Sequence, residues 1–269
     1  MEKKVWAIAL IVVLGICGLL GMLARSNITQ QQISAFPRWN YGEQGPQWWG
    51  QLDIAFQQCA IGQAQSPLNL SRPLAALLLP EQPIQWHYRP SFGIIQDLGT
   101  TLQIRPAGEN YFQLGSDIYA LQQIHFHHPS EHLIEGQAYA MEVHLVHQNS
   151  TGATAVVAVL VKTDMANGTF THLLQRFPRP FPHPGTIVAL DIADFLPKQP
   201  DSHMSYWGSL TTPPCTEGVR WIVLSEPITF APEQIAAYQT HYLPNARPVQ
   251  IRPVPLEEQA IADPLSKQL

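Results

Sequence analysis

Short runs of alternating hydrophobic and polar residues fill the middle of the chain, between residues 84 and 223. Alternation with a period of two is typical of β-strands, because successive side chains of a strand point to opposite faces of the sheet. The chain also has 24 prolines, which punctuate short elements and disfavour long helices. The pattern therefore predicts a mainly β fold. The runs that predict strands are residues 101–104, 122–127, 139–147, 153–161 and 219–224.

Two segments of the body favour a helix instead. One is residues 169–176, and the other starts after Pro232 and runs from Gln234 to Tyr238. No internal repeat and no change of composition divides the body. We therefore predict one β-dominated domain over residues 35–255, followed by a short polar tail, residues 256–269.

The start of the chain has a different pattern. Lys3 and Lys4 precede an almost wholly apolar run, residues 5–23, which is typical of a Sec-type export signal. As a helix this run would span roughly 28 Å, close to the thickness of a bilayer core, so a retained anchor fits equally well. We predict that residues 1–26 are a signal peptide or membrane anchor and that residues 27–34 are a linker. Either way the body is exported, to the periplasm or the extracellular space.

Composition and charge narrow the range of functions. The chain has 269 residues, of which 45% are hydrophobic and 13% charged, enough apolar material for a sizeable core. The formal net charge is −5 at pH 7 and the pI is about 6.1, so nothing indicates a nucleic-acid-binding surface. A small or neutral substrate is easier to reconcile with this balance.

The cysteines predict one covalent cross-link. Cys17 lies inside the apolar start, which leaves Cys59 and Cys215 as the only two in the body. A pair of cysteines in an exported domain predicts a disulfide. Two free, buried thiols are the alternative.

A histidine pair in one predicted strand is the first sign of a metal site. Gln123, His125 and His127 alternate, so they share one face of the strand. Ile124 and Phe126 point to the other face. Two imidazoles two residues apart on a strand can reach a common metal ion, although a lone pair of this kind is more often structural or exposed.

A second predicted strand can complete the site. Glu142, His144 and Val146 share a face there, and if the two strands pair, His144 joins His125 and His127. Three neutral ligands with an open fourth position are typical of catalytic zinc. Gln123 and Glu142 each lie beside a histidine and can accept its second N–H, which fixes the ring. Other nearby histidines lie out of phase or outside the strands, and we expect them to be structural: His128, His132 and His147.

The histidine segments belong to a longer series of motifs that resembles the alpha carbonic anhydrase family, of the bacterial, exported type. Each segment is common by chance, but together and in order they form a specific signal. The matching segments are residues 39–42, 65–69, 125–127, 130–132, 142–147, 208–215, 219–224 and 245–248.

The resemblance implies a fold and a reaction. It implies a single domain with a central twisted, mostly antiparallel sheet of about ten strands and a few short helices. It implies zinc on the three histidines and reversible hydration of carbon dioxide to bicarbonate and a proton, by attack of zinc-bound hydroxide. Thr211 and Glu131 would form a hydrogen-bonded pair beside the metal, and Asn245 would support it. Cys59 and Cys215 match the pair that forms a disulfide in bacterial members.

A substrate pocket follows from the same resemblance. Val146 shares a face with His144 and should line a cavity for carbon dioxide, which needs an apolar wall. Without the resemblance, Val146 and the other residues of this wall would be ordinary core residues, Glu131 would be a surface carboxylate and Thr211 would be a turn residue. The resemblance adds, for the wall and for contact with substrate or product, Val156, Leu210, Val219, Trp221 and Thr212.

One position departs from the fast members of the family. Those members have a proton-shuttling histidine where this chain has Thr100. Threonine cannot carry protons near neutral pH, whereas histidine can. We therefore expect proton transfer to limit turnover and to depend on buffer.

Three other functions stay open at this stage. One is a non-catalytic binding domain, whose relatives usually lose a zinc ligand. Another is a zinc hydrolase acting mainly on esters. The last is a structural envelope protein with a vestigial metal site.

Overall fold

The protein is described by a computed structural model over residues 39–70, 83–177 and 185–251. The predicted signal or anchor (residues 1–26), the linker (residues 27–34) and the tail (residues 256–269) lie outside the described residues. Within the described ranges, no helix is long and apolar enough to cross a membrane.

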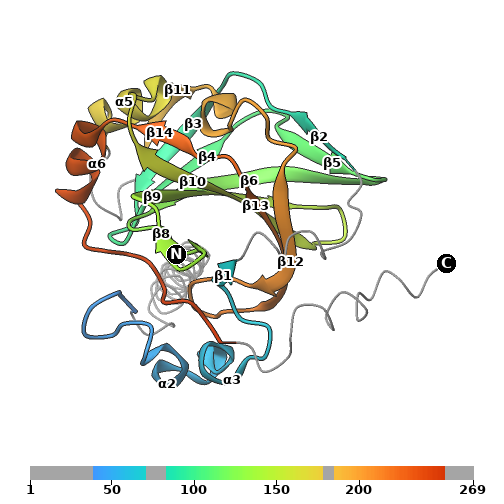
Figure 1. The fold of residues 1–269 in the computed structure, drawn as a ribbon, viewed down its shortest axis with the longest axis vertical. Helices are drawn as coiled ribbons and strands as arrows, with labels where there is room; N and C mark the ends of the chain where they lie inside the picture. The colour runs from blue at the N-terminus through green and yellow to red at the C-terminus, as the bar shows by residue number, and fades with distance from the viewer. Residues whose placement is uncertain (1–38, 71–82, 178–184, 252–269) are drawn as a thin grey trace, which may run out of the picture. The chain divides into compact units, whose positions relative to one another are not determined.

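Within the described ranges, eleven strands form one large sheet (Figure 1). Most neighbours are antiparallel, but β10 pairs in parallel with both β13 and β14. This confirms the prediction of a mainly β fold with a mostly antiparallel sheet of about ten strands. The strands are β2 (Ile84–His87), β3 (Ser91–Asp97), β4 (Leu102–Pro106), β5 (Tyr111–Leu114), β6 (Asp117–His127), β9 (Met141–Gln148), β10 (Thr154–Thr163), β11 (Thr186–Leu190), β12 (His203–Ser209), β13 (Glu217–Leu224) and β14 (Ile228–Phe230).

Short elements surround this sheet. A small second sheet joins three two-residue strands, and α5 and α6 lie side by side near β14 (Figure 1). Helices α5 and α6 lie within two residues of the two predicted helical segments. The small strands are β1 (Asn69–Leu70), β7 (Leu133–Ile134) and β8 (Gln137–Ala138). The helices are α2 (Trp49–Leu52), η1 (Ile54–Phe56), α3 (Gln58–Ile61), α5 (Gly168–Gln175), η2 (Ile192–Phe195) and α6 (Pro232–Gln239).

Strand β6 is longer than its alternation predicted. It begins at Asp117 rather than at residue 122, and its pairing with β9 shifts register between Leu121 and Gln123. Such a bulge adds one unpaired residue and interrupts the simple alternation. Beyond the bulge the period of two is regular, and this regular part carries the two histidines.

Both faces of the central strands are buried. On one face, Ile124 and Phe126 of β6 and Val143 and Leu145 of β9 are fully buried in the largest apolar cluster. On the other face the same strands carry the histidines, next to a smaller apolar cluster around Trp221. The sheet therefore holds the candidate site between strand backbones that are fixed from behind by tight packing.

Candidate metal centre and active site

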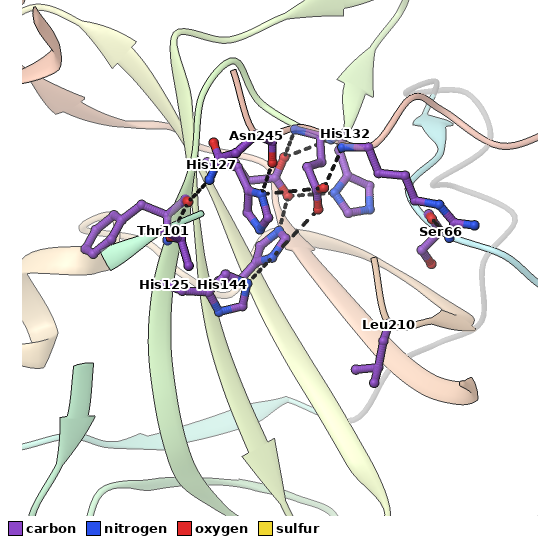
Figure 2. A network of polar contacts seen from close by, with 12 residues as sticks. Ser66, Thr101, His125, His127, His132, His144, Leu210 and Asn245 are labelled. Atoms are coloured by element: carbon purple, nitrogen blue, oxygen red, sulfur yellow. Dashed lines mark hydrogen bonds and ion pairs between the residues drawn. The ribbon is translucent and has the colours of Figure 1, made fainter. Parts of the chain in front are cut away.

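The pairing of β6 with β9 brings the three predicted ligands together. His125 lies directly opposite His144 in the ladder, and His127 lies two residues further along β6 on the same face. The ring centroids of the three histidines are 4.6 to 5.0 Å apart. Figure 2 shows the three rings turned toward one another, with His132 to their right. Their nitrogens lie close enough to share one metal ion.

Each of these rings has its outer nitrogen held by an oxygen acceptor. Nδ1 of His125 lies 2.8 Å from Oε1 of Gln123, and Nδ1 of His127 lies 2.7 Å from the backbone carbonyl of Asn245. Nε2 of His144 lies 2.7 Å from Oε1 of the Glu142 carboxylate. Amide carbonyls and carboxylates only accept, so each outer nitrogen must carry the proton.

The inner nitrogens are consequently bare lone pairs. Nε2 of His125 and Nδ1 of His144 are 3.2 Å apart, and Nε2 of His127 is buried without a hydrogen-bond partner. Lone pairs at this separation repel one another, and a buried acceptor without a partner costs free energy. A cation between the three nitrogens removes both penalties. The residues therefore fit a metal ion with three neutral nitrogen ligands.

Burial also favours the neutral imidazoles that ligation needs. It lowers the pKa of His127 to about 4 and lowers the pKa of His125 well below its ordinary value. Burial likewise lowers the pKa of His144, although the Glu142 carboxylate opposes the shift. Near neutral pH all three rings are therefore deprotonated on the inner side.

Glu142 is the centre of the polar network behind the histidines. Its Oε2 accepts from the backbone N–H groups of Glu131 (2.9 Å) and His132 (2.8 Å), and its Oε1 contacts His132 and His144, each at 2.7 Å. Burial alone would raise the pKa of Glu142, but the charges and hydrogen bonds of His132 and His144 lower it well below its ordinary value. Glu142 is therefore an ionised acceptor behind His144.

His132 takes part in this network although its sequence phase indicated only a structural role. Nδ1 of His132 lies 2.7 Å from Glu142, and its Nε2 lies 2.6 Å from the hydroxyl of Tyr206. Alternation along one strand does not reveal such a contact, because His132 follows β6 in a turn. Of the other two histidines expected to be structural, His128 hydrogen-bonds Tyr242 and His147 hydrogen-bonds Tyr88.

The predicted pair of Glu131 and Thr211 lies beside the histidines, and both residues are buried. Oε1 of Glu131 accepts from the backbone N–H of Arg247 at 2.8 Å. Its Oε2 lies 4.0 Å from Nδ1 of His144, and no hydrogen bond of normal length reaches it. Burial raises the pKa of Glu131 to about 7, while His144, the Arg247 N–H and the Thr211 side chain act to lower it.

The predicted apolar wall gathers next to His144. Val146, Val156 and Trp221 lie in one row across β9, β10 and β13. Val219 and Leu210 pack in the same cluster. The Trp221 ring lies 4.9 Å from the His144 ring, and its Nε1–H donates to the carbonyl of residue 209 at 3.0 Å. Thr212 is half-buried and follows Thr211 in the chain.

A disulfide joins Cys59 of α3 to Cys215. The predicted cross-link is therefore present, and the alternative of two free thiols is wrong. Residues 209–215 form a segment that leads from the end of β12 to this disulfide, and we call it the threonine loop. The bond ties this loop to the N-terminal helices.

Several residues that shape the site had no role predicted from their sequence pattern. Arg247 holds Glu131 through its backbone, and Thr101 donates its hydroxyl to the carbonyl of Phe126 at 2.7 Å. Thr100, which stands where a shuttle was expected, is half-buried, and its carbonyl accepts from the Asn245 side chain at 2.9 Å. Of the segments that make these contacts, only residues 245–248 matched a family motif, and that match did not indicate which atoms would form the hydrogen bonds.

Comparison with known proteins agrees with this geometry. A sequence model of the family described as eukaryotic-type carbonic anhydrase matches residues 44–254. A carbonic anhydrase of Nostoc sp. is 33% identical over 258 residues, which cover 93% of this chain and 96% of that protein. One from Klebsiella pneumoniae is 35% identical over 240 residues, covering 86% of this chain and 95% of that protein. The solved alpha-carbonic anhydrase of Thermovibrio ammonificans, in complex with sulfanilamide, superposes with a TM-score of 0.75 at 32% identity over 81% of this chain and 97% of that one.

Proposed function

The chain belongs to the alpha carbonic anhydrase family of enzymes, and from this premise we propose that it hydrates carbon dioxide reversibly, with a zinc ion held by His125, His127 and His144. Family membership implies the overall reaction. We propose, beyond that reaction, the identity of the metal and the roles of individual residues.

One observation carries the assignment of the metal. Each of the three rings donates its outer N–H to an oxygen, so the three inner nitrogens converge as lone pairs with no proton between them. Three neutral imidazoles are the ligand set of catalytic zinc with a position left for water. Bound there, zinc supplies a hydroxide nucleophile by lowering the pKa of its water to about 7, an effect for which carbonic anhydrase itself is the standard example.

Glu131 and Thr211 would orient the nucleophile. When Glu131 is ionised it only accepts hydrogen bonds, so Thr211 would donate a hydrogen bond from its hydroxyl to Glu131. The oxygen of Thr211 is then left to accept a hydrogen bond from the nucleophile, which turns a lone pair of the nucleophile toward the substrate. The interaction of the Thr211 side chain that acts to lower the pKa of Glu131 supports this role. So does the buried Oε2 of Glu131, which has no hydrogen bond of normal length within the described part of the chain, because a buried carboxylate oxygen requires a donor.

The apolar wall would receive carbon dioxide. The substrate has no net charge, and a surface formed by Val146, Val156 and Trp221 excludes water without offering a competing polar group. Thr212, half-buried beside this wall, would contact substrate or bicarbonate.

We also propose that the protein is exported to the periplasm or the extracellular space. The Cys59–Cys215 disulfide supports an oxidising compartment. A cleaved signal and an anchor retained through residues 5–23 both fit export, and fractionation of cells that produce the full chain distinguishes them. Recovery of the protein in the cytosol with reduced cysteines would contradict export.

Carbon dioxide hydration by the full-length protein tests the function. The initial rate is measured by stopped flow as purified, after removal of metal with a chelator, and after addition of one equivalent of zinc. We expect activity to disappear with the metal and to return with zinc. Hydrolysis of an activated ester is measured on the same samples, and we expect it to be slow.

Two results would point to other functions. A folded protein that binds no zinc and has no hydration activity would favour a binding or structural domain. Ester hydrolysis with a higher kcat/KM than carbon dioxide hydration would favour a hydrolase.

A further inference from the structure

Arg247 is a buried cation to which the proposed reaction gives no role. Only 2% of the residue is exposed. Its guanidinium donates to three neutral oxygens: the side-chain carbonyl of Gln65 (2.9 Å) and the backbone carbonyls of Ser66 (2.8 Å) and Cys59 (3.0 Å). None of the ion pairs among the described residues involves this guanidinium. Burial lowers the pKa of Arg247 to about 10 although the Glu131 carboxylate acts to raise it, and the guanidinium lies 5.9 Å from the centre of the Trp49 ring. Burying a charge that no carboxylate contacts directly costs free energy, so its position calls for another explanation.

The backbone of the same residue holds the Glu131 carboxylate. The Arg247 N–H donates to Oε1 of Glu131 at 2.8 Å, which leaves Oε2 on the side of His144. Residues 242–251 form no helix or strand, so no ladder of backbone hydrogen bonds fixes this N–H. The segment is fixed instead by the hydrogen bonds of Asn245, by the Gln250 N–H and by the side-chain contacts of Arg247, which act on the residue that holds the carboxylate.

The acceptors of the guanidinium also brace the threonine loop. Ser66 exchanges two hydrogen bonds with Ser209, at 3.0 and 3.1 Å. The side chain of Gln65 donates to the carbonyl of Cys215 at 3.1 Å, and Cys59 forms the disulfide with Cys215. All three acceptors of the guanidinium are thus attached to one end or the other of this loop.

We propose that Arg247 is a positioning residue, which sets the separation between the Glu131 carboxylate and the threonine loop that carries Thr211. Its N–H holds the carboxylate, and its guanidinium holds the segment that braces the loop. A lysine would keep the charge but would lose the planar fork that reaches three oxygens at once. The inference rests on the proposed function, because it assumes that Thr211 and Glu131 act together.

A double-mutant cycle tests this role in the full-length, zinc-loaded protein. The four members are the wild type, Arg247→Lys, Thr211→Val and the double variant. For each, zinc content, melting temperature, and kcat and KM for carbon dioxide hydration are measured, the kinetics in strong buffer so that proton transfer does not limit turnover. We expect Arg247→Lys to lower kcat roughly tenfold, with KM and zinc content nearly unchanged. In the Thr211→Val background we expect the same change to lower kcat less than about twofold.

Two further variants serve as controls. Arg176→Lys changes an exposed arginine at the end of α5 and should leave every readout unchanged. If Arg247→Lys fails to fold, Gln65→Leu replaces it in the cycle, because that change removes one acceptor and leaves the arginine in place. This change also removes the hydrogen bond from Gln65 to the carbonyl of Cys215, which belongs to the same brace, so its loss of kcat should likewise shrink in the Thr211→Val background.

The outcomes separate this inference from the proposed function. A tenfold loss that persists in the Thr211→Val background would overturn the positioning role, and so would a wild-type kcat in Arg247→Lys. A wild type without hydration activity, or a Thr211→Val variant with unchanged kcat, would instead overturn the proposed function and this inference with it.

Discussion

The two faces of strands β6 and β9 both pack against other parts of the protein, although His125 and Val146 on the site face are only half-buried, and the faces are built in different ways. On the core face, Ile124, Phe126 and Leu145 contact other hydrocarbon side chains, and no single contact determines their position. On the site face, His125 and His144 each have one specific partner for their outer nitrogen. The core face is specified by volume and the site face by individual hydrogen bonds, so burial alone does not predict how well a position tolerates substitution.

Adjacent residues of β9 give the largest expected contrast. His144→Ala removes a ligand, and we expect it to abolish zinc binding and hydration activity. Leu145→Ala creates a cavity on the core face, and we expect it to lower the free energy of unfolding by about 2–5 kcal/mol while zinc content and activity per folded molecule stay unchanged. Metal analysis, stopped-flow assays and urea denaturation of both variants measure the contrast. Loss of zinc in Leu145→Ala would show that the two faces are not separable.

His147 is an exception to this division between the two faces, because it is a histidine on the core face. Burial lowers its pKa to about 3, whereas an unfolded histidine titrates near 6.5. Between these values the unfolded chain binds one more proton than the folded chain, so stability falls as pH falls. This histidine should lower the free energy of unfolding by about 1.4 kcal/mol for each unit by which the pH falls in this range. We expect His147→Gln, which keeps an acceptor for Tyr88, to remove this contribution. Urea denaturation at pH 4.5 and 6.5 measures the slope, and equal slopes in both proteins would contradict the assignment.

Glu142 tests how much one charge contributes on the site face. Glu142→Gln keeps the shape of the side chain but removes the charge behind His144. We expect zinc affinity to fall by about 10- to 100-fold, the general range for such partners, for which carbonic anhydrase is itself a known example. Competition with a chromophoric chelator gives the affinity. Leu160→Val, on the neighbouring strand, is a control that should leave it unchanged.

The smallest expected effect concerns the transfer of protons out of the site. Thr100 stands beside Asn245 and cannot carry protons. We expect Thr100→His to raise kcat roughly tenfold in weak buffer, below the range for native acid–base groups, and to have little effect in strong buffer. Turnover measured against buffer concentration tests this. A wild type that is fast and independent of buffer would contradict the idea that proton transfer limits turnover.

The sequence predicted the elements whose signal is local. A period of two placed Gln123 beside His125 and Glu142 beside His144, and the structure has both contacts. Helices α5 and α6 were predicted to within two residues, and Pro232, after which the second was predicted to start, is the first residue of α6. The four shorter helices of the described ranges, which the sequence did not predict, are α2, η1, α3 and η2. Where the signal was interrupted, as at the bulge of β6, the predicted strand was too short.

Contacts between distant segments could not be predicted from local patterns. The carbonyl of Asn245 fixes His127 across a separation of 118 residues, and Arg247 reaches Cys59 across 188. Both lie in a segment without regular structure, where no periodicity indicates which way an atom points. The family resemblance supplied Asn245 as a supporting residue, but only the fold shows that its backbone accepts from His127.

The disulfide described above has a consequence for proteolysis. Cys59 and Cys215 are 156 residues apart, and the covalent ring that they close contains His125, His127, His144 and Thr211. A single cut at a turn inside this ring, such as residues 149–152, leaves both fragments linked through the disulfide. A nicked molecule would therefore migrate as one species in a denaturing gel and separate into two only when a reductant is added.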